Sequence, residues 1–266
     1  MKSYIKNIIV LVVTVVVAFI ASMDFLSMHK IEKIGDNPNI TEIKMLSEYS
    51  PRLKGTSLDT EVYFFDSGVE GGTFLILGGT HPNESAGLVA ATALIENIEV
   101  EEGRVIIIPR TNNSGFTHTS PFDGMQDFFT LTLFDGSERT FRVGNRLTNP
   151  VHQWPDRNYY EGTSGRTIYG TENAEVRNVN RLYYGTEDGV LTEQVCYGIY
   201  NLILEENVSI TMDMHEGSPE FLYLDCTMVN MKRDNTTAMS IASDMALSMN
   251  FDDLDMRAEY SGVTSY

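Results

Sequence analysis

The sequence predicts an α/β protein in which a central sheet is covered by helices on both faces. Short, β-rich apolar runs alternate along the chain with segments of helical spacing. Of the 266 residues, 42% are hydrophobic and 10% aromatic, which is enough to build a buried core. Because strands that alternate with helices place those helices on the faces of a sheet, we expect the sheet to be covered on both sides.

The expected elements follow one another in a regular order. The strands are predicted at residues 61–65, 73–77, 104–108 and 208–214, and the helices at 85–98, 191–204 and 236–249. Residues 112–170 are rich in Gly, Asn, Pro and aromatic residues and have weak periodicity, which predicts a long inserted loop.

The N-terminal residues are typical of a membrane-directed segment. Lys2 and Lys6 precede an apolar run at residues 8–23. About 20 apolar residues are needed to cross a bilayer, so the run fits either a cleaved signal peptide or an uncleaved anchor. The residues around Ala18 and Ala21 make a poor cleavage site and favour the anchor, and a buried core helix is a further alternative.

The same run sets the expected domain organisation and location. The two lysines ahead of the run predict that the rest of the chain lies outside the cytoplasm, membrane-anchored or secreted. We expect residues 1–23 to be the anchor or signal segment, 24–57 a stalk or linker with a short leading helix, and 58–266 the globular domain.

Charge and cysteine content exclude several classes of protein. The chain has 19 Lys and Arg residues against 37 Asp and Glu residues, a formal net charge of -18, so nucleic acid is not an expected partner. Cys196 and Cys226 can form at most one bridge and cannot build a four-thiolate zinc site.

Two groups of metal-binding side chains follow predicted strands. His81 and Glu84 lie in the turn after residues 73–77, and His215 ends the strand at 208–214. Two imidazoles and a carboxylate suit Zn²⁺, and three protein ligands leave a position for water. Asp213 shares a face with His215 and could orient a ligand. The alternatives are a polar turn histidine, an ordinary first-turn acid and a hydrogen-bonded core histidine.

A basic run, Arg177 to Arg181, lies upstream of the last predicted strand. Guanidinium groups bind carboxylates and can stabilise a developing oxyanion, although a solvated basic patch explains the composition equally well. The remaining histidines, His29, His118 and His152, have no neighbours at ligand spacing and are interpreted as structural or exposed.

Taken in order, the three motifs resemble the signatures of the zinc carboxypeptidase superfamily, specifically its succinylglutamate desuccinylase/aspartoacylase branch. The motifs are Gly78-Gly-Thr-His81-Pro-Asn-Glu84, Arg177-Asn-Val-Asn180-Arg181 and Asp213-Met-His215-Glu216. The resemblance covers about residues 58–250. It implies a mixed central sheet, a zinc ion held by His81, Glu84 and His215, and a substrate carboxylate held by Asn180 and Arg181. It assigns no role to Arg177, and the long insertion departs from a minimal family member.

In the family that the chain resembles, the general base is a Glu on a strand well beyond the last zinc histidine. Glu216 is adjacent to a predicted ligand and should point to the other face of its strand, and Glu220 has no supporting position. We therefore expect the base beyond Tyr266 and interpret the chain as incomplete at its C-terminus.

The resulting hypothesis is a zinc hydrolase of amide or ester bonds, of the deacylase or carboxypeptidase type. Its expected partners are the membrane, through the N-terminal segment, and a small-molecule or peptide substrate with a free carboxylate. An aspartic protease is disfavoured because the run Asp66-Ser67-Gly68 has no second copy, and a serine hydrolase because G-x-S-x-G is missing. The non-enzymatic alternative is an extracytoplasmic binding module that keeps the metal and carboxylate pocket.

Overall fold

The computed structural model describes residues 2–27, 30, 32–119, 126–133, 135–153, 173–217, 226–228, 236–251 and 257–259. The helices are α1 (Lys2–Ser27), α2 (Ser85–Asn97), α3 (Leu191–Glu205) and α4 (Thr236–Phe251). The strands are β1 (Glu42–Met45), β2 (Glu61–Asp66), β3 (Thr73–Leu77), β4 (Arg104–Ile108), β5 (Phe128–Thr132), β6 (Glu138–Arg142), β7 (Ile210–Asp213), β8 (Cys226–Met228) and β9 (Arg257–Glu259).

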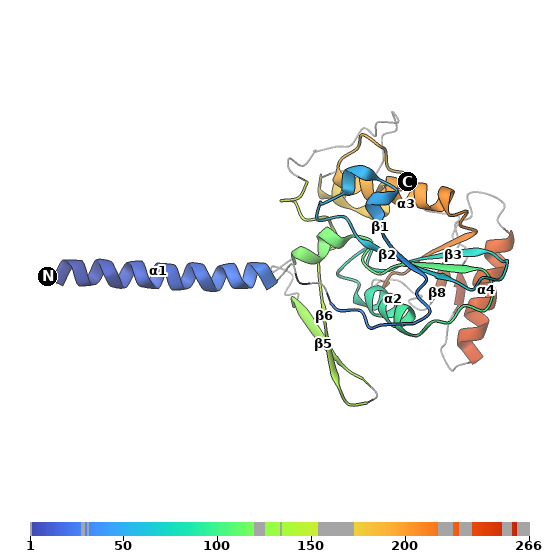
Figure 1. The fold of residues 1–266 in the computed structure, drawn as a ribbon, viewed down its shortest axis with the longest axis horizontal. Helices are drawn as coiled ribbons and strands as arrows, with labels where there is room; N and C mark the ends of the chain where they lie inside the picture. Colours follow the sequence, from blue (N-terminus) through green and yellow to red (C-terminus); the bar gives the residue numbers. More distant parts are fainter. Residues whose placement is uncertain are drawn as a thin grey trace.

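A five-stranded mixed sheet forms the centre of the molecule, in the order β1-β2-β4-β3-β7 (Figure 1). Strands β4, β3 and β7 run parallel, whereas β1 and β2 are antiparallel to their neighbours. The register pairs Ile108 with Leu77 and Leu77 with Asp213, so the carboxyl ends of the three parallel strands lie at one edge. In an open α/β sheet this is the edge at which ligands bind.

Alternate side chains of the central strands pack against helices on opposite faces. Leu75 and Leu77 of β3 belong to a cluster that includes Val195 and Ile199 of α3. Ile76 belongs to the other cluster, with Ala91 and Ile95 of α2. Successive residues of a strand point to opposite faces, which explains why a continuous apolar run fits this position. The predicted α/β fold with a mixed sheet and helices on both faces is confirmed.

Two regions differ from the organisation predicted from the sequence. Part of the expected stalk at residues 24–57 is built into the domain, because β1 pairs with β2 and Leu46 and Leu53 are fully buried. The expected loop at residues 112–170 contains the β5–β6 hairpin. Both elements depend on tertiary contacts, since the hairpin packs Phe129 and Phe141 with residues of α2. Residues 120–125 and 154–172 of this loop lie outside the described residues.

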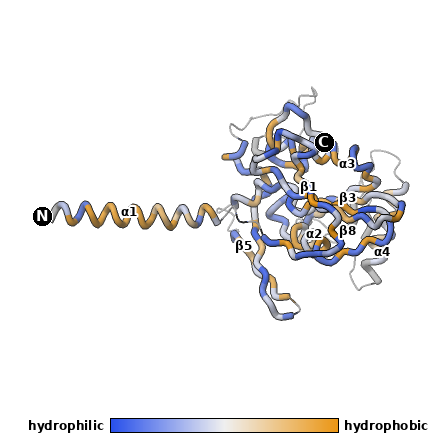
Figure 2. The backbone as a smooth tube through the Cα atoms, viewed as in Figure 1, coloured by the Kyte–Doolittle hydropathy of each residue, from blue (hydrophilic) through white to orange (hydrophobic). Residues whose placement is uncertain are grey.

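Helix α1 stands apart from the body of the molecule (Figure 1) and is apolar along most of its length (Figure 2). Residues Tyr4–Ser27 are long and apolar enough to cross a membrane, and none of this stretch is buried in the structure. A signal sequence passes the same test of length and composition.

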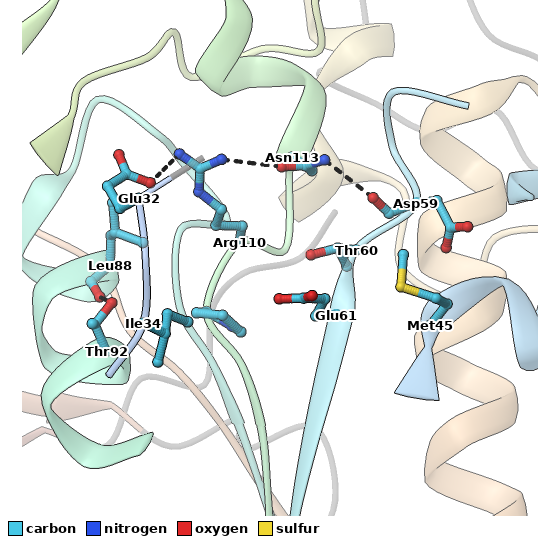
Figure 3. Close-up of a pocket in the computed structure, with 11 residues that line it drawn as sticks. Glu32, Ile34, Met45, Asp59, Thr60, Glu61, Leu88, Thr92, Arg110 and Asn113 are labelled. Carbon is cyan, nitrogen blue, oxygen red and sulfur yellow. Dashed lines mark hydrogen bonds and ion pairs between the residues drawn. The ribbon is translucent and has the colours of Figure 1, made fainter. Parts of the chain in front are cut away.

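The segment that follows α1 is fixed to the domain near the end of β4. A cavity of about 120 Å³ lies between this segment, α2 and the start of β2, and Figure 3 shows Glu32 pointing toward Arg110 at its rim. Arg110 is buried and forms an ion pair with Glu32. Burial lowers the pKa of Arg110, and the Glu32 carboxylate opposes that effect. The pair therefore connects the segment after α1 to the end of β4.

Candidate metal centre

The predicted metal ligands are positioned by two neighbouring parallel strands. His81 and Glu84 lie in the turn between β3 and α2, and His215 lies two residues after β7. Because Leu77 of β3 is paired in register with Asp213 of β7, the two segments leave the sheet side by side. The structure thus brings together the three side chains that the sequence placed at strand ends.

Two glycines allow the turn, the helix and the end of β7 to approach one another closely. Gly79 adopts φ 60°, a left-handed conformation that glycine tolerates best. A Cβ on Gly87 would lie 2.9 Å from the carbonyl oxygen of Met214, closer than real Cβ atoms come. The first turn of α2 can therefore rest on the backbone that leads to His215.

The carboxylate of Glu84 lies between the two imidazole rings. Its Oε1 is 2.7 Å from Nδ1 of His81, and its Oε2 is 2.8 Å from Nδ1 of His215. One ligand atom from each of the three residues lies within 4.8 Å of the others. Two nitrogens and an oxygen that converge in this way form a donor set suited to Zn²⁺.

The far nitrogen of each ring is held by an oxygen acceptor. Nε2 of His81 lies 2.9 Å from Oδ1 of Asn178, which is fully buried. Nε2 of His215 lies 3.1 Å from Oδ2 of Asp213. Such contacts fix the tautomer and the ring orientation of metal-binding histidines. Asp213 thus contacts His215, the ring that it was predicted to orient, and Asn178 is a residue that the sequence reasoning missed.

Asp213 is itself held by two hydroxyl groups. Thr80 donates to its Oδ1 at 2.7 Å and Tyr183 donates to its Oδ2 at 2.9 Å. Neither hydroxyl was singled out in the sequence, although Thr80 belongs to the first motif. A carboxylate can accept several hydrogen bonds at once, so Asp213 accepts these two bonds and can still accept from His215. The two hydroxyl groups fix the orientation of the Asp213 carboxylate.

The hydrogen bonds in the site favour an ionised Glu84 and a protonated His215. Burial raises the pKa of Glu84, but hydrogen bonds to His215 and His81 outweigh it and lower the pKa to about 2. Burial lowers the pKa of His215, but hydrogen bonds to Asp213 and Glu84 outweigh it and raise the pKa to about 10. Both shifts reflect stabilisation of positive charge beside Glu84.

The site has a closed side and an open side. The residue His81 is 3% exposed, whereas the side chain of His215 is 29% exposed. Glu216 is exposed, and its carboxylate accepts a hydrogen bond from the backbone N–H of Ala86 at the start of α2. This carboxylate is therefore engaged at the N-terminus of α2, which favours a negative charge.

The basic run lies next to the candidate ligands, in the 3-10 helices η5 (Asn173–Arg177) and η6 (Val179–Arg181). The side-chain nitrogen of Asn180 is 3.4 Å from Nε2 of His215. Arg181 lies beside Asn180 and forms an ion pair with Glu175 at 3.8 Å. Arg177 is buried and donates to the carbonyl oxygen of Thr148 at 2.6 Å, so it holds the chain together away from the rings.

The histidines outside the three motifs lie elsewhere. His152 contacts Ser114 at 2.7 Å and Ser57 at 3.2 Å. Burial, followed by the charge of Arg177, lowers the pKa of His118 to about 4. Neither belongs to the cluster of potential metal ligands among the described residues, and His29 lies outside those residues.

Comparisons with known proteins find similarity only at the level of structure. No family model and no curated protein matches the sequence. The chain is similar to an aspartoacylase family protein from Mesorhizobium loti, with 18% identity, a TM-score of 0.47, and coverage of 82% of this chain and 55% of that one. It is also similar to a putative carboxypeptidase A from Shewanella denitrificans, with 13% identity, a TM-score of 0.47, and coverage of 93% and 52%.

A succinylglutamate desuccinylase/aspartoacylase from Rhodobacter sphaeroides gives 17% identity, a TM-score of 0.45, and coverage of 76% of this chain and 50% of that one. The chain thus spans about half the length of these solved structures. They are members of the superfamily and branch that the three motifs resemble. The likeness concerns the fold, at identities too low to transfer an activity.

Proposed function

We propose that this chain is a zinc-dependent hydrolase that cleaves an amide, or an ester, in a substrate with a free carboxylate, as a deacylase or a carboxypeptidase does. The observation that carries the proposal is the convergence of His81, Glu84 and His215, whose ligand atoms lie within 4.8 Å of one another. The superfamily of hydrolases that the motifs resemble gives the reaction class.

The hydrogen-bond network supports a metal ion in this position. The amide nitrogen of Asn178 donates to Glu175 at 2.7 Å, so its oxygen must accept the proton on Nε2 of His81. Nδ1 of His81 then faces Glu84 at 2.7 Å either with a second proton or with its lone pair. A lone pair on Nδ1 and a carboxylate oxygen are both acceptors, so at this distance they repel each other unless a cation lies beside both atoms. Zn²⁺ can be that cation.

The same reasoning applies to His215. Asp213 accepts from Thr80 and Tyr183, so it acts as an acceptor toward Nε2 of His215. With its pKa raised to about 10, the ring carries a proton on Nδ1 that is shared with Glu84, 2.8 Å away, and a bound metal ion would take the place of that proton. Both rings therefore present Nδ1 to the same point, which is the arrangement that a shared metal ion requires.

In this proposal each residue near the centre has a distinct role. His81, Glu84 and His215 hold zinc, which supplies Lewis acidity toward water and the scissile carbonyl group. Asn180 and Arg181 hold the substrate carboxylate, and the contact between Asn180 and His215 sets its distance from the metal ligands. Asp213 and Asn178 keep the rings oriented and do not touch the substrate.

No general base is assigned among the described acids near the site. Among the described acids near the site, Glu84 and Asp213 are engaged with the imidazoles and Glu216 with the N-terminus of α2. Because these commitments leave none of the three as a base, a binding module that keeps the metal and carboxylate pocket is the second candidate function.

Zinc content of the purified full chain tests the metal assignment. The wild type should bind about one zinc ion, His81→Ala and His215→Ala should lose most of the binding, and Glu84→Gln should weaken it. His29→Ala is the matched control, because this histidine lies outside the three motifs. Zinc content unaffected by both histidine substitutions would refute the site.

Turnover separates the enzyme from the binding module. N-acetylated amino acids and short peptides are suitable substrates, tested on the zinc-loaded chain. Hydrolysis that is lost with His81→Ala supports the enzyme. Zinc binding without hydrolysis of any of these substrates supports the binding module.

We also propose that α1 anchors the domain outside the cytoplasm. Support comes from the unburied apolar stretch Tyr4–Ser27 and from Lys2 and Lys6, which precede most of it.

A further inference from the structure

A carboxylate of the chain itself lies among the positive groups beside the candidate metal centre. Oε2 of Glu175 accepts a hydrogen bond from Nδ2 of Asn178 at 2.7 Å. The same oxygen is 3.3 Å from a terminal nitrogen of Arg146 and 3.8 Å from Nε of Arg181. One amide and two guanidinium groups, from the basic run and from the segment around Arg146, thus lie around one oxygen of Glu175.

The position of Arg146 could not be foreseen from its place in the long inserted segment. The backbone N–H of Thr148 donates to the carbonyl oxygen of Arg177 at 2.8 Å, which brings this segment against the basic run. Nε of Arg146 is buried and has no hydrogen-bond partner among the described residues. Arg146 is therefore a second guanidinium group at this rim, with hydrogen-bonding capacity beyond Glu175.

Glu175 is connected to both halves of the proposed site. Through Asn178 it reaches Nε2 of His81, one of the candidate metal ligands. Through Arg181 it reaches the pair of residues proposed to hold the substrate carboxylate. The side chain of Glu175 is 32% exposed and that of Arg146 is 38% exposed, so a ligand arriving from solvent can meet both.

We propose that Glu175 is a specificity-determining residue that fills a carboxylate seat formed by Arg146 and Arg181. Two guanidinium groups and one carboxylate leave a net charge of one at this seat, so it favours ligands with one carboxylate over ligands with two. The proposal rests on the proposed function, which places the substrate carboxylate at Arg181. A second ligand carboxylate would have to compete with Glu175 for the same donors, at a Coulombic cost.

Binding of two small acids to the zinc-loaded full chain tests this inference. Butyrate and succinate have the same number of carbons and differ in the second carboxylate. By titration calorimetry, Glu175→Gln should raise the affinity for succinate relative to butyrate by about tenfold, because it removes a negative charge a few ångströms from the ligand. Glutamine can still accept from Asn178, so zinc content should not change.

Two further variants show whether charge at this position is the cause. Glu175→Asp keeps the carboxylate and should keep the preference of the wild type. Asp188→Asn removes an equal charge from the surface, where Asp188 pairs with Arg52 and is 90% exposed, and should leave both affinities unchanged. Circular dichroism establishes that each variant is folded.

The inference is overturned if the affinity for succinate relative to butyrate falls in Glu175→Gln or changes by less than twofold. It is also overturned if no variant binds either acid. Repeating the titrations without zinc separates this result from the metal assignment. If zinc does not bind but the ratio still rises in Glu175→Gln, the metal assignment fails and the carboxylate seat stands. If zinc binds and the ratio does not rise, the seat fails and the metal centre stands.

Discussion

The side-chain oxygen of Asn178 lies 2.9 Å from Nε2 of His81, and the amide that carries it is fully buried. The same oxygen accepts the backbone N–H of Asn180 at 3.0 Å. A single side chain therefore fixes both the ring of a candidate metal ligand and the backbone of a residue proposed to bind substrate. Its position couples the metal half of the site to the carboxylate half.

Asn178→Ala should lower zinc affinity about 10-fold to 100-fold, because His81 loses the acceptor that holds its tautomer and orientation. Asn178→Asp keeps an acceptor for Nε2 and should restore most of the affinity, although it loses the bond to Glu175. Competition of the purified variants with a zinc chelator measures the affinities. Asn180→Ala is the control and should keep zinc. Equal zinc affinity of Asn178→Ala and wild type would contradict the orienting role.

Close packing at Gly87 gives a second prediction. A Cβ at this position would lie 2.9 Å from the carbonyl oxygen of Met214, and backbone on both sides leaves little room to relax. Gly87→Ala should therefore lower the free energy of unfolding by about 1–3 kcal/mol and weaken zinc binding, because the end of β7 must move away from α2. Chemical denaturation and zinc titration measure the two effects.

Gly198→Ala is the matched control for Gly87→Ala. Gly198 also lies inside a helix, but its Cβ would meet only side-chain atoms of Leu46 and Ser50, at 3.1–3.3 Å. These can shift, and alanine favours a helix by up to about 1 kcal/mol over glycine. Its stability should stay close to that of the wild type. An equal decrease in the free energy of unfolding of both variants would show that an added methyl group destabilises either helix. The close contact between Gly87 and the end of β7 would then not be the cause.

The strands and the strand-end positions of His81 and His215 could be predicted because each has a signal of its own. Strands β3 and β4 coincide with the predicted runs 73–77 and 104–108, since both are apolar and buried on two faces. His81 and His215 end or follow such strands, so topology alone brings them to one edge. The ion that they hold stays a prediction.

The elements that escaped prediction depend on distant partners. Strand β1 is mostly exposed, and it is a strand because residues 42–45 pair with β2. Asn178 and Glu175 lie in or beside 3-10 turns without periodicity, and only the folded chain brings them to His81 and Arg146. The basic run was the one available signal, and only the family resemblance singled out Asn180 and Arg181 within it.

The proposed anchoring role of α1 leads to a prediction about location. Expressed in a bacterium with its N-terminus intact, the chain should fractionate with membranes, and its domain should be cleaved by protease added outside the cytoplasmic membrane. A variant without residues 1–27 should be released into the soluble fraction, because the unburied apolar stretch of α1 is lost. Recovery of the complete chain, uncleaved at its N-terminus, in the soluble cytosol would rule out the anchor.

The last prediction concerns a charged cluster on the α3 side of the sheet. Glu206 accepts hydrogen bonds from Tyr49 at 2.5 Å, from Arg104 at 3.0 Å and from Lys44 at 3.2 Å. Burial raises the pKa of Glu206, but the bonds to Tyr49, Arg104 and Lys44 outweigh it and lower the pKa. The cluster joins β1, β4 and the residue after α3, so its charge state should affect global stability.

Because the folded state lowers the pKa of Glu206, its stabilising effect is complete above the unfolded pKa, which is about 4.3, and is lost as the pH falls through the folded value. Glu206→Gln should lower the free energy of unfolding by about 2 kcal/mol at pH 7, with the difference from wild type shrinking below about pH 4. The exposed neighbour Glu205 supplies the control Glu205→Gln, which should have little effect. Urea denaturation from pH 3 to pH 8 measures the difference. A difference that stays constant across this range would mean that the ionised form of Glu206 is not what stabilises the fold.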